Sequence, residues 1–256
     1  MRKMGEGASK KVSGLTANEG IRADSPWPGL KLVDMGVDAP GGWSAGKILI
    51  ETVIDGLGEV NFGEFYINGF ALPSVDIYLD HPAKTRLPES KNVNGKAVCF
   101  YENQRLLYAE VNKIPDLSDM EDMAAAFGCK GKELTLAVTS PTSLVAAIYG
   151  CSLAASGVLE HLLKKGLAQE EILWAWATAP LPPLADDPGI MADRLKAALA
   201  YGAVTSFWVR TGDEKIKEAF DGMDRFGELR MHNLSSARTF IHGSVDRMKL
   251  QEAFRV

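Results

Sequence analysis

The sequence predicts an α/β fold in which helices pack on mixed sheets. Three observations predict it. Strand-like apolar runs alternate with helix-like runs, glycine or proline separates most of them, and two strand-turn-helix units begin near residues 30 and 134. Hydrophobic residues make up 46% and charged residues 24% of the 256, typical of a folded globular chain that buries a core without disulfides.

The first half of the chain reads as strands separated by turns, with two helices. A helix is expected over 44–54, after the glycine turn at 40–42, and a second one from Ser118 to about Phe127. Ser118 and Glu121 have the spacing of a capping box, and Gly128 is the expected stop. The expected strands are 30–35, 59–66, 75–79 and a hairpin of 97–101 with 106–111.

The second half alternates more regularly between strands and helices. A long apolar helix is expected after the cap at 140–143, ending at Lys164, Lys165 and Gly166. Asp186 and Asp187 are expected to cap a helix near 190–201, with Pro188 in its first turn. The remaining expected strands are 134–138, 172–178, 204–209 and 238–242, and the remaining helices are 214–220 and one from Val245.

Composition disfavours several classes of function. Twenty-eight basic against 33 acidic residues give a net charge of −5, and only residues 2–11 form a short basic run, so nucleic acid is not an expected partner. Residues 1–29 are expected to be a mobile amino-terminal segment rather than a secretory signal. The apolar region 144–163 contains Glu160, His161 and two serines, so a core helix is favoured over a membrane span. A cytoplasmic location is therefore expected.

The three cysteines and four histidines are dispersed and show no metal-ligand spacing, so the sequence offers no metal site. The cysteines are expected to act as small buried hydrophobic residues.

Three segments could bind a ligand. Gly41 and Gly42 lie in a tight turn before a helix whose amides could face an anionic or amide group, although such glycines can serve backbone geometry alone. Asp80 and His81 follow a strand, where Asp80 could orient the imidazole, although an exposed turn explains the pair equally well. The residues at 140–143, with Thr142 and Ser143, gather hydroxyls at a helix start, which simple capping also explains.

Glu160 is a further candidate acid on the long helix. Its neighbour His161 points about 100° away around the helix, so the two cannot form one dyad, and a solvated helix face is favoured.

Four segments occur in the order found in one known family. They read DMGVDAPGGWSAG from residue 34, DHPA from residue 80, TSPTSLV from residue 139 and AWATAPLPPL from residue 175. Together they resemble the methenyltetrahydromethanopterin cyclohydrolase family over about residues 30–256. The resemblance implies a two-lobed α/β region over 30–256, with lobes of about 30–132 and 133–256.

The resemblance also implies a reaction, in which water opens the methenyl bridge of a reduced pterin to give the formyl derivative without a metal or redox cofactor. The resemblance further implies an Arg and a Glu one turn apart on the helix that follows the PTS turn. This spacing puts both side chains on one face of the helix. In this chain, Leu153 or Ala154 stands where the Arg is expected. Ala155 or Ser156 stands where the Glu is expected.

A second departure follows residue 83, where the family's GSGPARA segment has no counterpart. Both departures favour a shortened, divergent paralogue that binds a reduced pterin in tetrahydromethanopterin-linked metabolism, or in biosynthesis of that cofactor, without the standard reaction. The first alternative is a divergent cyclohydrolase that uses Asp80, His81 or Glu160 for proton transfer. The second is a non-enzymatic assembly subunit. The resemblance implies a homo-oligomer, specifically a trimer, with the pterin as substrate or ligand and no other cofactor.

Overall fold

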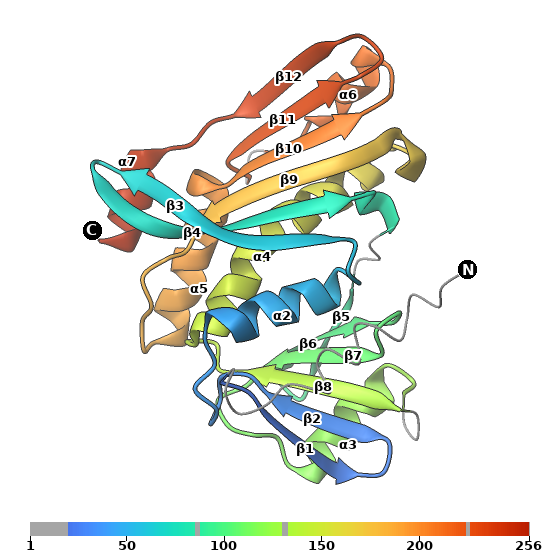
Figure 1. The fold of residues 1–256 in the computed structure, drawn as a ribbon, viewed down its shortest axis with the longest axis vertical. Coiled ribbons are helices and arrows are strands. Elements are labelled where there is room, and N and C mark those ends of the chain that lie inside the picture. Colours follow the sequence, from blue (N-terminus) through green and yellow to red (C-terminus); the bar gives the residue numbers. More distant parts are fainter. Residues whose placement is uncertain (1–19, 85–87, 130–132, 224–225, 256) are drawn as a thin grey trace. The chain divides into compact units, whose positions relative to one another are not determined.

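The computed structural model describes residues 20–84, 88–129, 133–223 and 226–255. Contacts divide the chain into unit 1, made of residues 1–56 and 86–149, and unit 2, made of residues 57–85 and 150–256. Each unit contains one six-stranded sheet, shown in Figure 1. The expected lobes, 30–132 and 133–256, differ from this grouping because residues 57–85 belong to unit 2 and residues 133–149 belong to unit 1.

The sheet of unit 1 is mixed. Strands β2, β8 and β7 run parallel to one another, and the outer pairs are antiparallel. The carboxyl ends of three neighbouring strands therefore meet at one edge, where α/β proteins commonly bind ligands. In sheet order the strands are β1 (Arg22–Trp27), β2 (Leu30–Asp34), β8 (Leu134–Thr139), β7 (Leu106–Glu110), β6 (Lys96–Tyr101) and β5 (Glu89–Val93).

Helices α2 (Trp43–Val53) and α3 (Leu117–Ala126) lie on opposite faces of the unit 1 sheet (Figure 1). The core beneath α3 includes Met120 and Met123, which pack with buried leucines and valines of the central strands. The expected N-cap of α3 at Ser118 is wrong. Asp116 caps this helix and accepts a hydrogen bond from the Asp119 amide at 2.9 Å, because an aspartate one position before the helix already supplies the acceptor.

Strand β1 corrects the expectation that residues 1–29 form a mobile terminus. Residues 22–27 pair antiparallel with β2, and this pairing satisfies backbone groups along one edge of β2. Residues 1–19, including the basic run at 2–11, lie outside the described residues.

The sheet of unit 2 is also mixed, with β10 and β11 parallel and the other pairs antiparallel. The two mixed sheets with their helices confirm the predicted fold class. In sheet order the strands are β12 (Arg238–Gly243), β11 (Glu228–Asn233), β10 (Val204–Val209), β9 (Ile172–Pro180), β4 (Phe70–Asp80) and β3 (Gly58–Ile67).

Helix α4 (Leu144–Lys164) begins in unit 1 and continues in unit 2, as the long apolar pattern predicts. By length and composition α4 could cross a membrane, but 67% of its most apolar window is buried, as in a core helix. The Asp187 carboxylate caps α5 (Pro188–Ala197), which confirms that prediction. The other helices of unit 2 are α6 (Asp213–Ala219), α7 (Arg247–Phe254), and the short η2 (Pro82–Lys84), η3 (Gln169–Glu171) and η4 (Ala198–Gly202).

One face of the unit 2 sheet carries exposed aromatic side chains. Tyr78 pairs with Trp176 across β4 and β9, and Trp174 pairs with Trp208 across β9 and β10. Tyr78 is 49% exposed and Trp174 is 46% exposed, whereas the alternate β9 residues, such as Ala175, are buried. The strand therefore points its small residues inward and its tryptophans outward, as the sequence alternation predicts.

Candidate functional site

The loop after β2 is built around the buried carboxylate of Asp34, which is 2% exposed. One oxygen accepts hydrogen bonds from the amides of Gly36 (3.0 Å) and Val37 (2.8 Å). The other accepts from the amides of Asp38 (3.0 Å) and Ala39 (2.7 Å). Four donors on one buried carboxylate compensate its desolvation and fix the loop in a single path.

The turn before α4 packs directly against this loop. The Ser140 amide donates to the Gly36 carbonyl at 3.0 Å, and a Cβ added at Gly36 would lie 3.0 Å from the Ser143 Cβ. The Ser143 hydroxyl accepts from the Ala146 amide at 3.1 Å and so caps the helix. The Thr142 hydroxyl lies 3.1 Å from the Ser140 hydroxyl. Three hydroxyls therefore gather where β8 leads into α4.

Gly41 and Gly42 form the other side of this junction, at the start of α2. Gly41 has a φ of 65°, and a Cβ there would lie 2.8 Å from the Met35 carbonyl oxygen. Gly42 is the N-cap of α2 and has no side chain to cap it, so its place at the positive end of the helix suits a polar ligand group. The structure thus brings Gly41, Gly42, Thr142 and Ser143 to one edge of the unit 1 sheet.

A buried polar chain reaches the same edge from β7 and was not expected from the sequence. The Tyr108 hydroxyl donates to the Glu110 carboxylate at 3.1 Å and lies 2.9 Å from the Thr139 hydroxyl. Burial raises the pKa of the Glu110 carboxyl, and the hydrogen bond from Tyr108 partly opposes that shift. Glu110 pairs in register with Thr139 at the carboxyl ends of β7 and β8. A carboxyl group with a raised pKa at such an edge is a candidate acid or base for proton transfer.

Two further tyrosines hold this chain in place. The Tyr101 and Tyr149 hydroxyls lie 2.5 Å apart, and the Tyr149 ring lies 4.1 Å from the Tyr108 ring between centroids. Burial raises the pKa of Tyr101, Tyr108 and Tyr149, so all three stay protonated at neutral pH. The period-two spacing of Tyr108 and Glu110 puts both side chains on one face of the strand, but this spacing alone does not mark a functional group.

Asp80 and His81 lie in unit 2, at the end of β4. Both side chains are exposed, and His81 has a φ of 51°. Their amides are held by the carbonyls of Leu57 and Leu173. Within the described ranges, no side-chain hydrogen bond joins the Asp80 carboxylate to the His81 ring. The arrangement in which Asp80 orients the imidazole is therefore not formed here.

Glu160 is exposed near the end of α4 and forms an ion pair with Lys164 one turn later. The His161 ring instead lies 3.1 Å from the Asp221 carbonyl oxygen. The two side chains thus have separate partners, as their spacing on the helix predicts. Of the four positions where the resemblance suggests charges, Leu153 is exposed, Ala154 and Ala155 are buried, and Ser156 donates to the Leu153 carbonyl.

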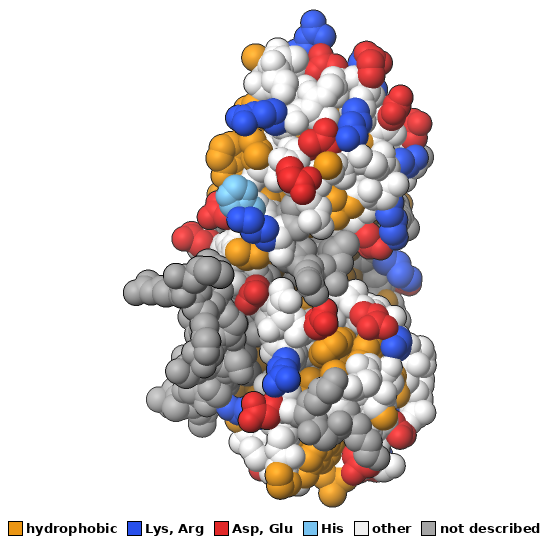
Figure 2. Space-filling view, turned by 90° about the vertical axis from the view of Figure 1, so that its right-hand side faces the viewer, with side chains coloured by type: hydrophobic (Ala, Val, Ile, Leu, Met, Phe, Trp, Pro, Cys, Tyr) orange, Lys and Arg blue, Asp and Glu red, His pale blue; other side chains and the backbone are white. Residues whose placement is uncertain are grey.

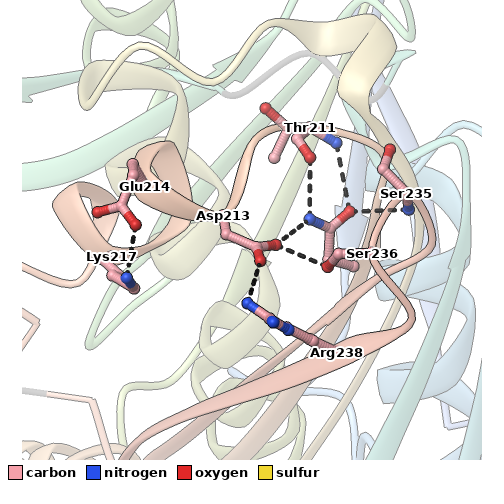
Figure 3. A network of polar contacts seen from close by, with 8 residues as sticks. Thr211, Asp213, Glu214, Lys217, Ser235, Ser236 and Arg238 are labelled. Atoms are coloured by element: carbon pink, nitrogen blue, oxygen red, sulfur yellow. Dashed lines mark hydrogen bonds and ion pairs between the residues drawn. The ribbon is translucent and has the colours of Figure 1, made fainter.

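Unit 2 also contains a cluster of polar side chains, which joins neighbouring elements of its fold. As Figure 3 shows for its labelled members, the Asp213 carboxylate accepts a hydrogen bond from the Ser236 hydroxyl and forms an ion pair with Arg238. The buried Asn233 amide also donates to Asp213 and to the Thr211 carbonyl. The hydrogen bond from Ser236 is the largest cause that lowers the Asp213 pKa. These contacts tie the start of α6 to the turn between β11 and β12.

Among the residues that the structure describes, no group of three or more His, Cys, Asp or Glu side chains could hold a metal ion. Cys129 and Cys151 are buried and Cys99 is partly buried. On the face drawn in Figure 2, acidic and basic side chains are interspersed rather than gathered by sign.

The chain matches the family model described as Cyclohydrolase (MCH) over residues 13–91 and 100–252. A methenyltetrahydromethanopterin cyclohydrolase of Methanospirillum hungatei is 28% identical over 205 residues, covering 69% of this chain and 65% of the relative. The protein of that name from Methanosphaerula palustris is 27% identical and covers 62% of this chain and 59% of its own length. The one from Methanocaldococcus jannaschii is 23% identical and covers 72% of this chain and 67% of its own length. The chain therefore spans less than two thirds of the length of the first two relatives.

Proposed function

The chain belongs to the cyclohydrolase (MCH) family, and from this we propose that it binds a reduced pterin in tetrahydromethanopterin-linked one-carbon metabolism or in biosynthesis of that cofactor. We propose further that it does not carry out the standard opening of the methenyl bridge. The proposal requires no metal or redox cofactor.

One observation carries the proposal, namely the junction of two strand-to-helix turns in unit 1. Asp34 fixes the first turn, and Thr142 and Ser143 lie in the second. A pterin ring offers amide and amine edges, which suit backbone amides and hydroxyl groups held in fixed positions. Such a junction at the carboxyl ends of adjacent parallel strands is a usual place for a ligand.

The missing charges on α4 support the second part of the proposal. Within 150–157 the helix carries small or apolar residues and no Arg or Glu. Water attack on a methenyl carbon needs a base for the water proton and groups that stabilise the developing charge. A helix face without either charge is better suited to holding a pterin than to hydrolysing it.

Glu110 favours a second candidate function, a divergent cyclohydrolase. In that reaction a water oxygen bonds to the methenyl carbon while Glu110 takes a water proton, and one carbon–nitrogen bond then breaks to leave a formyl group and an N–H. The sum consumes one water and releases one proton. The raised pKa of Glu110 suits this proton transfer.

The experiment follows the absorbance of methenyltetrahydromethanopterin with the purified protein, with calorimetric binding of the methenyl and tetrahydro forms in parallel. Binding without hydrolysis above the buffer rate is expected. Hydrolysis that is lost in Glu110→Gln would replace the first function with the second. Absence of both binding and turnover would favour the assembly subunit.

Binding-site variants locate the ligand. Thr142→Val is expected to weaken pterin binding about tenfold, the value of one lost hydrogen bond to a polar ligand group. Ser118→Ala, an exposed site on α3, is the control. Asp80→Asn tests the unit 2 pair of Asp80 and His81 separately. Unchanged affinity in both Thr142→Val and Asp80→Asn would remove the proposed site.

We also propose that the protein is a homo-oligomer, specifically a trimer, in the cytoplasm. The exposed aromatic face of the unit 2 sheet, with Tyr78, Trp174 and the 61% exposed Ile241, supports an association surface. Light scattering should give a mass of three chains, and Trp174→Glu should lower it. A wild-type mass of one chain would refute this.

A further inference from the structure

Glu110 is a partly buried carboxylate whose capacity to accept hydrogen bonds is largely unused. The Tyr108 hydroxyl donates to one of its oxygens at 3.1 Å. Among the residues that the structure describes, no other group donates to this carboxylate, and no lysine or arginine forms an ion pair with it. The buried carboxylate of Asp34 instead accepts four amide hydrogen bonds. Donors of this kind offset the hydration that a carboxylate loses on burial, so Glu110 has acceptor sites that a ligand can fill.

Glu110 lies at the end of the strand next to the proposed pterin site. Strands β2, β8 and β7 are parallel neighbours, and their carboxyl ends lead to the loop after Asp34, to the turn at 140–143 and to Glu110. The Val111 amide donates to the Thr139 carbonyl at 2.8 Å, which holds β7 against the start of that turn. Adjacent strands lie about 4.8 Å apart, so Glu110 is roughly one strand spacing from the turn.

The Glu110 side chain projects from the face of the sheet that α2 and α4 cover. Glu110 pairs in register with Thr139, and the Tyr108 hydroxyl lies 2.9 Å from the Thr139 hydroxyl. The Tyr149 ring of α4 packs against the Tyr108 ring on this face. The alternate β7 residues, such as Leu107, point to the other face and pack with α3. Both α2 and α4 begin at the edge where Glu110 lies, so the acid and the two helix starts can contact one ligand.

The open acceptor sites of Glu110 suit one edge of a pterin. A pterin carries an amino group at C2 beside its N3–H, so two N–H groups point outward side by side, as they do from a guanidinium group. A carboxylate accepts from such a pair through both of its oxygens. Burial raises the pKa of the free Glu110 carboxyl, and two donors on a ligand would lower it again by stabilising the charged form.

We propose that Glu110 selects the ligand by its amine-bearing pyrimidine edge, accepting hydrogen bonds from the C2 amino group and from N3–H. This role rests on the proposed pterin-binding function and assigns the residue that recognises the ring. The methenyl bridge lies at the opposite end of the ring system from that edge. A Glu110 carboxylate that holds the edge is therefore too far away to act on the methenyl carbon, so this role and the role of a hydrolytic base exclude each other.

The test compares two ligands that differ at one position, tetrahydropterin and tetrahydrolumazine, which carries an oxo group in place of the C2 amino group. Calorimetry under argon measures both dissociation constants with the full chain, and binding of methenyltetrahydromethanopterin is measured in parallel. The wild type should bind tetrahydropterin about tenfold or more tightly than tetrahydrolumazine. A hydrogen bond to a charged group contributes that much affinity, and the oxo group has no proton to offer the carboxylate.

Glu110→Gln should reverse this preference. The carboxamide has nearly the same shape and its oxygen still accepts from the Tyr108 hydroxyl, but its nitrogen donates instead of accepting. That pattern matches the N3–H and the C2 oxo group of tetrahydrolumazine. Tetrahydrolumazine should therefore bind more tightly and tetrahydropterin more weakly, each by about tenfold. Glu133→Gln, an exposed position just before β8 at the opposite edge of the sheet, should leave both affinities unchanged.

The parallel titration distinguishes two kinds of failure. Wild-type protein that binds neither the methenyl form nor tetrahydropterin would overturn the pterin-binding function and the role of Glu110 with it. Binding of the methenyl form without a preference for tetrahydropterin over tetrahydrolumazine would overturn the role of Glu110 alone. The same conclusion would follow if Glu110→Gln kept the wild-type preference, or if Glu133→Gln changed it as much as Glu110→Gln does.

Discussion

The hydroxyl group of Tyr108 donates a hydrogen bond to the carboxylate of Glu110 at the carboxyl end of β7. Two opposing influences therefore act on one acid. Burial favours its neutral form, and the tyrosine favours its charged form. The pKa of Glu110 that results from these two influences decides whether its carboxylate is available as a base at neutral pH.

Tyr108→Phe should raise the pKa of Glu110 further, because the variant removes the donor that stabilises the carboxylate and leaves the burial in place. Carboxyl carbon chemical shifts followed through a pH titration would measure it. A Glu110 pKa that stays the same or falls in the variant would contradict the assigned role of the tyrosine hydroxyl.

Glu110 should also make stability fall as pH rises. The folded state holds the Glu110 proton more tightly than the unfolded chain, since the folded pKa is raised. The stabilisation from this group is thus complete below the unfolded pKa and is lost as pH rises through the higher folded pKa. Urea unfolding at several pH values should show that the free energy of unfolding falls less steeply over that pH window in Glu110→Gln than in the wild type. Parallel curves for the two proteins would disprove the linkage.

Asp34→Asn should destabilise unit 1 by on the order of 3 kcal/mol, because the amide nitrogen cannot accept the hydrogen bonds that one carboxylate oxygen accepts. Urea denaturation measures the loss. Asp38→Asn is the matched control, since Asp38 is exposed in the same loop and surface changes stay within about 0.5 kcal/mol. Similar losses in both variants would show that the four-donor arrangement is not what stabilises the loop.

Gly36→Ala should cost more stability than Gly42→Ala. Both glycines have a positive φ, 148° and 134°, so both variants strain the backbone. A Cβ at Gly36 also meets Ser143 at 3.0 Å, whereas nothing lies within 4 Å of a Cβ at Gly42. Thermal unfolding should therefore give a lower melting temperature for Gly36→Ala than for Gly42→Ala. The reverse order would mean that crowding against the turn before α4 has no effect.

Strand β9 and helix α4 were predictable from the sequence because their signals are strong, whereas the interior strand β11 was not predicted. Strand β9 alternates small inward residues with outward tryptophans, and α4 is a long apolar run with a cap at one end and a glycine at the other. Strands β1 and β5 were missed because they lie at sheet edges. Their residues are mostly exposed, so no apolar alternation marks them.

The candidate site was partly predictable. Gly41, Thr142 and Ser143 were identified from turn and capping chemistry, and the structure places them at one sheet edge. Glu110 was missed because its role depends on burial and on a tyrosine hydroxyl, and neither is visible in residue spacing alone. Charged residues at strand ends are common, so sequence patterns give no reason to choose this one.

The start of α3 gives a last test, since sequence and structure assign its cap to different residues. Asp116→Ala should cost about 1 kcal/mol, because it removes the acceptor for the Asp119 amide. Ser118→Ala should cost little, since Ser118 is exposed inside the helix and alanine favours helix there. Urea unfolding of the two variants decides between them. A larger loss in Ser118→Ala would restore the capping box that the sequence suggests, because a serine inside a helix has no other reason to stabilise it.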